Sequence, residues 1–249
     1  MDESFYPKDE LEKRRQIEEL QQRWELDKRN ENFVRDGFYP YYFHQPVRVL
    51  FIGRESYGMG GCDYLLTHYE VYRGDLSFNR RAFHRRIFYM LHAVLEGYEK
   101  WDEVPTAHDY ARDFASDRHV SFAFMNISKI SNETNKTATQ WGVLRSFVER
   151  SSREIRQEIE LLDPELIITA NLTLCDILDE IKVVHCAEDN VLDVHTAKLN
   201  GRIIPIFNTY HWSYPGVKDR RAFYECIRDA WRKFGKESQK SPCLPGTKC

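Results

Sequence analysis

Four short apolar runs constrain the fold of this chain more than any other feature of its sequence. Each is short, rich in β-branched or aromatic residues and bounded by glycine, asparagine or proline, as is typical of a strand buried on both faces. The runs are Val47–Ile52, Val120–Met125, Leu166–Ala170 and Ile203–Phe207. Segments of helical periodicity separate them. This alternation predicts an α/β fold: a three-layer sandwich with a central, mainly parallel four-stranded sheet and helices on both faces.

The connecting segments show the spacing of amphipathic helices. Their apolar residues recur every three or four positions, which places them on one face of a helix. We expect helices over Arg81–Glu96, Trp141–Leu162, Leu172–Ile181 and Asp219–Phe234. The pair Asp163-Pro164 ends the second of these helices, and Asn200-Gly201 predicts a hairpin turn before the last strand.

The two ends of the chain differ from this α/β region. The segment Lys8–Asn30 is dense in charge and has Ile17, Leu20 and Trp24 at helical spacing, which predicts an amphipathic helix. We expect it to pack on the domain, and a partner-binding arm is the alternative. The expected division is a charged N-terminal helix (residues 1–30), an α/β domain (31–234) and a disordered tail without periodicity (235–249).

Charge and cysteine content argue against several classes of protein. The formal net charge is −3, so any nucleic-acid contact must come from a local basic face. The six cysteines form no C-x-x-C pair, which argues against a zinc site or metal cluster and favours reduced thiols. The first ten residues, MDESFYPKDE, are polar, and no run of 18 apolar residues exists. We therefore expect a protein of the cytoplasm, or of the nucleus in a eukaryote, with no membrane contact, metal or cofactor.

Polar residues that suit a functional site follow three of the strands. Ligands of open α/β sheets bind at the carboxyl ends of the strands. Here the first strand leads into the glycine-rich loop Gly53–Gly61, the second ends at Asn126, and the last leads into Asn208–Gly216. No Gly-Lys-Ser/Thr ends the first loop, so it is not a P-loop, and the loops carry no nucleophile elbow or paired-histidine metal motif.

Each of these loops also has a purely structural alternative. A glycine-rich loop is as often a tight turn as a site, an asparagine often caps a turn, and a lone histidine is more often structural. Glu55 and Tyr57 favour a site because a carboxylate and a phenol are costly to place at a strand end without partners. His211 lies among aromatic residues and a serine in a Pro-Gly loop. One carboxylate, one amide (Asn126) and one imidazole suit water activation, base recognition and stabilisation of a leaving group.

In this order, the loops resemble the motifs of the uracil-DNA glycosylase superfamily. The counterparts read Gly53-Arg54-Glu55-Ser56-Tyr57, Phe124-Met125-Asn126 and His211-Trp212-Ser213, and the resemblance covers roughly Val47–Trp231. It implies a uracil-DNA glycosylase-like fold and a hydrolase that cleaves the N-glycosidic bond of uracil or another altered base in DNA. The chain departs from the best-known branch at Glu55, which replaces an aspartate, and at Ser56 and Trp212, which stand where prolines are frequent.

The resemblance also implies a role for individual residues. Glu55 would orient or deprotonate the attacking water, and His211 would stabilise negative charge on the departing base. The substrate-binding residues would be Gly53, Arg54, Tyr57, Asn126, Ser213 and Tyr214. Among them, Tyr57 would form a wall against a bulky C5 substituent, and Asn126 would hydrogen-bond the pyrimidine edge. Tyr214 or Val217 would fill the gap left by the flipped base.

A group of arginines lies close to the first loop in the sequence. Arg80, Arg81, Arg85 and Arg86 are the expected contacts to the DNA backbone, and a solvated helix face is the alternative. The expected partner is single- or double-stranded DNA. A non-catalytic nucleic-acid or nucleotide-binding sensor or effector module on the same fold is the alternative function, and a hydrolase of free nucleosides or nucleotides is a third. The basic group favours the polymer.

Overall fold

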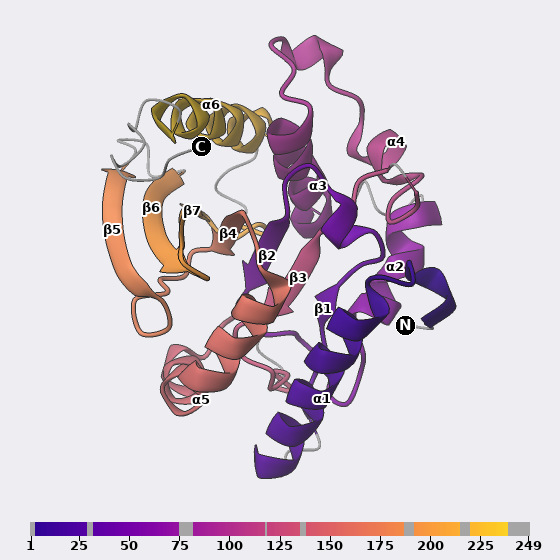
Figure 1. Cartoon of the computed structure of the whole chain (residues 1–249), viewed down its shortest axis with the longest axis vertical. Coiled ribbons are helices and arrows are strands. Elements are labelled where there is room, and N and C mark those ends of the chain that lie inside the picture. Colours follow the sequence, from indigo (N-terminus) through magenta and orange to yellow (C-terminus); the bar gives the residue numbers. More distant parts are fainter. Residues whose placement is uncertain are drawn as a thin grey trace, which may run out of the picture.

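The structure is a computed structural model, and it describes residues 3–28, 32–74, 82–117, 119–134, 138–186, 192–214 and 220–238. Within these residues a mixed sheet of seven strands forms the centre of the molecule (Figure 1). Its order is β1 (Gly37–Phe38), β3 (Ala123–Asn126), β2 (Val49–Gly53), β4 (Leu166–Ala170), β7 (Arg202–Thr209), β6 (Leu192–Leu199) and β5 (Asp179–Cys186). The α/β class expected from the sequence is confirmed, and the sheet is larger than the four strands expected.

Strand direction changes across the sheet. β3, β2, β4 and β7 pair in parallel, whereas β1 at one edge and β6 and β5 at the other are antiparallel to their neighbours. In the parallel part, Gly53 pairs with Asn126, and Ala170 pairs with Thr209. The carboxyl ends of four strands therefore lie along one edge of the sheet.

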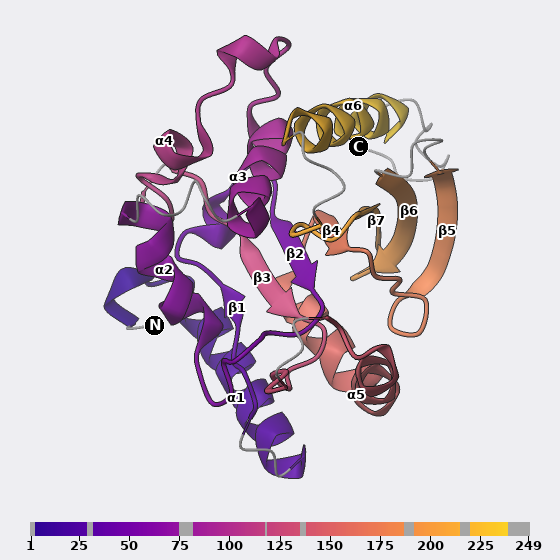
Figure 2. The ribbon, with the colours of Figure 1, turned by 180° about the vertical axis from the view of Figure 1, so that it is seen from behind.

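The parallel strands β2, β3 and β4 are buried on both faces. In β2, Val49 and Phe51 belong to one core cluster, and the intervening Leu50 and Ile52 belong to the other. Alternate side chains of a strand point to opposite faces, so an unbroken apolar run requires cover on both. The first core receives α3 (Ala82–Leu95) and α6 (Arg220–Ser238), and the second receives α1 (Leu11–Lys28) and α5 (Trp141–Leu162) (Figures 1 and 2).

The remaining described helices are short. α2 (Tyr64–Gly74) and α4 (Ala107–Ala111) lie beside α3 on its side of the sheet (Figure 2). The 3₁₀ turns are η1 (Glu3–Phe5), η2 (Tyr42–His44) and η4 (Trp101–Glu103). None of these was expected from the sequence, nor were β1 and β5.

Three helices and one turn follow the sequence pattern. α3, α5 and α6 match the expected helices, and α5 ends where Asp163 adopts a left-handed φ of 46° and its amide donates to the carbonyl of Ile159. The hairpin between β6 and β7 turns at Asn200 and Gly201, which have φ of 46° and 77°. Two successive residues with positive φ match the right-handed twist of the flanking strands.

The helix expected over Leu172–Ile181 is wrong. Its four leucine and isoleucine residues up to Leu178 are buried, but the amides of Ile177 and Leu178 both donate to the carbonyl of Leu174, which closes a single turn. Glu180 then takes a φ of 53° inside β5, which begins at Asp179. The helical spacing therefore describes one turn above the core and not a continuing helix.

The N-terminal helix α1 packs on the domain in this structure. Ile17, Leu20 and Trp24 are buried, and Trp24 stacks on Phe147 of α5 with ring centroids 5.7 Å apart. Most of the tail expected to be disordered lies outside the described residues, and α6 extends to Ser238. Over the described ranges, no helix has the length and apolar character needed to cross a membrane.

Candidate functional site

The three loops singled out in the sequence meet in one cleft of about 860 Å³. It lies at the carboxyl ends of the parallel strands, where strand direction and register place the ends of β2, β3, β4 and β7 together. All eight catalytic and substrate-binding residues expected from the sequence line it, namely Gly53, Arg54, Glu55, Tyr57, Asn126, His211, Ser213 and Tyr214. The cleft is also lined by residues that the sequence did not point out, among them His68, Phe83, Thr139, Trp141 and Tyr210.

Asn126 lies buried at the end of β3. Its side chain is 3% exposed, and Nδ2 has no hydrogen-bond partner among the described residues. On the adjacent strand Gly53 leaves room for it, because a Cβ there would lie 3.0 Å from Asn126 Oδ1. The amide of Ile127 donates to the carbonyl of Gly53 (2.9 Å), which holds the two strand ends together. An unpartnered buried amide donor is costly, so it favours a ligand acceptor in the cleft.

A buried ionic network holds the backbone of Asn126 in place. The backbone amide of Asn126 donates to Asp36 Oδ2 (2.7 Å), and the ammonium of Lys129 pairs with Asp36 Oδ1 and with Glu158 (2.8 Å). Gln21 of α1 donates to the same glutamate (2.6 Å). The side chains of Asp36, Lys129 and Glu158 are fully buried, and burial raises the pKa of Asp36. Sequence patterns do not predict this network, because an isolated lysine in a polar loop is normally solvated.

Glu55 is a half-buried carboxylate at the mouth of β2. Burial raises its pKa, whereas a hydrogen bond from Thr139 and the charge of Arg54 act in the opposite direction. Its Oε2 atom is buried and has no hydrogen-bond partner in the described part of the chain. A carboxylate with one unpartnered oxygen can accept a proton from a water molecule or orient it.

Arg54 shapes the cleft next to Glu55. Its Nε donates to the carbonyl of Ala170 (3.2 Å), Nη1 donates to Thr139 Oγ1 (3.4 Å), and the guanidinium lies 4.5 Å over the ring of Trp141. These contacts tie the first loop to β4 and to the start of α5. Arg54 therefore supports the wall of the cleft in addition to lining it.

His211 is held as a neutral imidazole. Burial lowers the pKa of its imidazole to about 4, and the positive charges of Arg54 and Arg86 contribute to the same shift. Its Nδ1 accepts the backbone amide of Ser213 (3.3 Å) and lies 2.7 Å from that residue's hydroxyl. A neutral ring that accepts at Nδ1 carries its proton on Nε2, so Nε2–H is a hydrogen-bond donor.

The prediction that a group of four arginines contacts DNA phosphates is wrong for Arg86. This residue is 4% exposed, and its Nη1 donates to the carbonyls of Trp212 (2.7 Å) and Tyr214 (3.0 Å). A guanidinium enclosed in this way braces the His211 loop and is not available to DNA. Arg85 is half-buried on the same helix. Arg80 and Arg81, and the alternative wedge Val217, lie outside the described residues.

Aromatic rings form the walls of the cleft. Tyr64 lines it and stacks on Phe124 with an interplanar angle of 5° and ring centroids 4.4 Å apart. Phe83 lies 5.7 Å from the His211 ring. Tyr57, expected as a wall of the pocket, lies at the rim and is 51% exposed. Flat apolar walls with a few polar groups between them suit a planar heterocycle.

The chain has no match among known protein-family models and none among curated proteins. No group of histidine, cysteine, aspartate or glutamate side chains suited to a metal ion occurs among the described residues. The cleft brings together the carboxylate of Glu55, the amide of Asn126 and the imidazole of His211.

Proposed function

We propose that this protein is a DNA glycosylase that hydrolyses the N-glycosidic bond of uracil or of another altered base. The observation that carries the proposal is convergence: Glu55, Asn126 and His211 come from three separate segments and line one cleft. The parallel strands β3, β2, β4 and β7 at the centre of the sheet support a uracil-DNA glycosylase-like fold. The resemblance of the loop sequences supports the same conclusion.

The proposed mechanism divides the work between the two sides of the bond. Cleavage passes through an oxocarbenium-like state with positive charge on the sugar and negative charge on the departing base. The ionised Glu55 stabilises the sugar and takes a proton from the attacking water. Nε2–H of His211 donates to the base oxygen that gains charge, and Nδ2 of Asn126 donates to the pyrimidine edge. Donors fixed in advance of the reaction stabilise such charge without a reorganisation cost.

The raised pKa of Glu55 is compatible with this role. A general base works best when its pKa lies near the operating pH. Burial of the Glu55 carboxylate raises its pKa in that direction while the charge of Arg54 limits the shift. His211 contributes as a neutral donor, since its pKa of about 4 leaves it uncharged at neutral pH.

A cleavage assay tests the proposal. Uracil-containing single- and double-stranded DNA is incubated with the protein and then treated with alkali, which cuts the strand at abasic sites. We expect cuts with the native protein and a loss of about 100-fold or more in Glu55→Ala and His211→Ala. Glu19→Gln, an exposed change on α1, is the matched control and should leave the activity intact.

The same assay separates the alternatives. Binding of DNA without cuts, unaffected by Glu55→Ala, would favour the non-catalytic module. Release of base from free deoxyuridine with inert DNA would favour a nucleoside hydrolase. Either result would contradict the proposed glycosylase.

A further inference from the structure

The rim of the cleft carries aromatic side chains that the proposed chemistry does not use. Within the described residues, the exposed large aromatic side chains are Phe5, Tyr57, Trp141 and Tyr214. Three of these four line the cleft, and Phe5 does not. Large apolar side chains that gather in the open around one cleft mark a binding surface.

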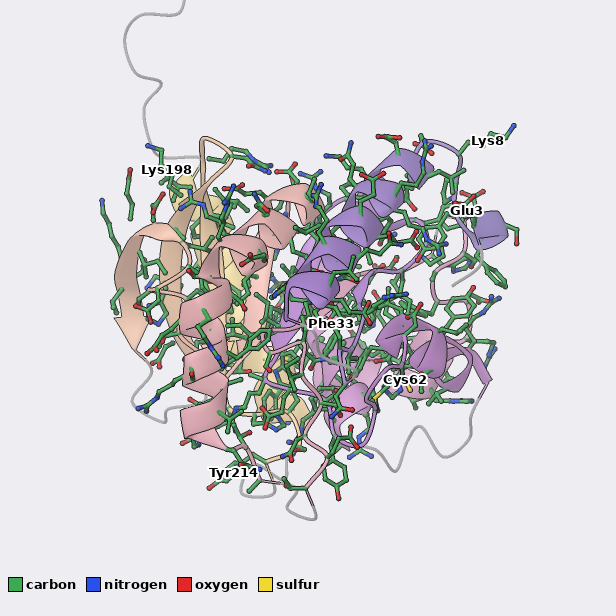
Figure 3. The ribbon with its side chains drawn as sticks, turned by 90° about the horizontal axis from the view of Figure 1, so that it is seen from below. Glu3, Lys8, Phe33, Cys62, Lys198 and Tyr214 are labelled. Carbon is green, nitrogen blue, oxygen red and sulfur yellow. The ribbon has the colours of Figure 1, made fainter. Side chains whose placement is uncertain are left out.

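Two of these rings are fixed from one side. The guanidinium of Arg54 covers Trp141, which is 42% exposed, at 4.5 Å. Tyr214, 46% exposed, stacks on Tyr210 with ring centroids 5.2 Å apart and an interplanar angle of 24°. Figure 3 shows Tyr214 at the outer edge of the molecule. Each ring is thus held in place while much of its surface faces solvent, which lowers the entropic cost of stacking a ligand on it.

A cationic side chain lies on the same helix as Trp141, one turn further along. Besides the cleft described above, Trp141 and Asn171 also line a neighbouring hollow of about 330 Å³, whose wall includes Arg145. Arg145 follows Trp141 by one turn of α5, is exposed, and has no ion-pair partner among the described residues. A ring for stacking and a cation one helical turn away match a nucleotide, which presents a flat base and a phosphate.

We propose that this cleft takes single-stranded DNA, in which a base next to the target stacks on Trp141 and the adjoining phosphate pairs with Arg145. A second flanking base stacks on Tyr214. In a duplex both faces of each base are covered by neighbouring pairs, so only an unpaired strand offers free faces to these rings. The identity of the target base rests on the proposed glycosylase function, whereas binding of the flanking nucleotides does not.

Fluorescence anisotropy with a short fluorescein-labelled oligothymidylate, alone or annealed to its complement, tests this proposal. The single strand should bind the native protein more tightly than the duplex. Trp141→Ala and Tyr214→Ala should each weaken single-strand binding about five- to a hundred-fold, and Trp141→Phe should retain most of it. Phe5→Ala, which removes an exposed ring outside the cleft, is the matched control and should bind as the native protein does.

The phosphate contact has its own readout. Arg145→Gln should weaken binding and reduce the slope of log affinity against log salt by about 0.7, the value for one phosphate on a single strand. Arg153→Gln removes the same charge two turns further along α5, where it lines none of the described hollows, and should leave the slope unchanged.

Excision of uracil measured on the same proteins separates the two proposals. If Trp141→Ala and Tyr214→Ala excise uracil at the native rate and bind the single strand with unchanged affinity, the single-strand proposal is wrong and the glycosylase proposal is retained. Affinity that depends on these rings, without excision, would support the surface and overturn the enzyme. Duplex binding as tight as that of the single strand and equally sensitive to both variants would also overturn the single-strand proposal.

Discussion

Gly53 and Asn126 face each other at the carboxyl ends of β2 and β3, and a Cβ atom on Gly53 would lie 3.0 Å from Oδ1 of Asn126. The same Cβ would lie 3.1 Å from the ring of Phe124. The missing side chain at position 53 therefore sets where the asparagine amide lies in the cleft.

Gly53→Ala should displace the Asn126 amide by a few tenths of an ångström. Because misplacement of a recognition group by about 1 Å costs about 100-fold, we expect kcat/KM for uracil excision to fall by about ten-fold. Gly235→Ala in α6, where an added Cβ meets nothing within 4 Å, is the control and should leave the rate unchanged. Equal rates for the two variants would contradict the proposed role of this contact.

The buried network behind Asn126 makes a prediction about stability. Lys129→Met should lower the free energy of unfolding by about 3–5 kcal/mol, because it leaves the carboxylates of Asp36 and Glu158 buried without their cation. Urea denaturation measures the loss. Lys198→Met removes a half-exposed lysine, seen at the periphery in Figure 3, and should cost about 1 kcal/mol or less. Similar losses in both variants would show that the buried network is not special.

The sequence pattern predicts the parts of the fold in which burial is continuous. Leu166–Ala170 and Trp141–Leu162 have the bounds expected, because one is an unbroken apolar run and the other keeps a single apolar face over its whole length. β5 was missed because it lies at the edge of the sheet, where Val183 and Val184 are exposed and no regular alternation marks a core face. The helix expected over Leu172–Ile181 is wrong because apolar residues at helical spacing over one turn are found both in an isolated turn and in a helix.

Some residues of the candidate site could likewise be predicted from the sequence, and others could not. Glu55, Asn126 and His211 could be found from the sequence, since they directly follow apolar strands whose carboxyl ends must meet. Asp36 and Lys129 could not, because Asp36 lies far along the chain from its partner Asn126, and Lys129 lies far from its partner Glu158. Arg86 was expected at the surface with its neighbours, but charge pattern alone does not reveal that loop carbonyls enclose it.

His92 should make the fold sensitive to acid. Its ring is 2% exposed, neither nitrogen has a hydrogen-bond partner in the described structure, and burial lowers its pKa to about 4. Between the ordinary pKa of 6.5 and about 4, the unfolded chain binds a proton that the folded chain does not. The free energy of unfolding therefore falls as the pH drops through this window, by at most about 3 kcal/mol from this residue. In His92→Phe, urea denaturation at several pH values should show a shallower fall, and an unchanged pH dependence would refute this assignment.

The fall of activity at low pH should reflect protonation of the Glu55 carboxylate. The ionised form of this carboxylate is the active one, and burial raises its pKa above the ordinary 4.5. The rate should therefore be full at neutral pH and fall as the pH is lowered through a value above 4.5, before His211 becomes protonated near pH 4. A pH profile of kcat/KM on a uracil-containing single strand measures this. An acid limb at or below the ordinary carboxylate value would contradict the role of Glu55 as base.

Single-turnover release of free uracil from a single strand, with protein in excess, tests the central claim most directly. If the carboxylate, the amide and the imidazole act on one bound base, the native protein releases uracil, and Glu55→Gln, Asn126→Ala and His211→Ala each slow release by about 100-fold or more. Native protein that releases no base, or variants that release it at the native rate, would contradict the account.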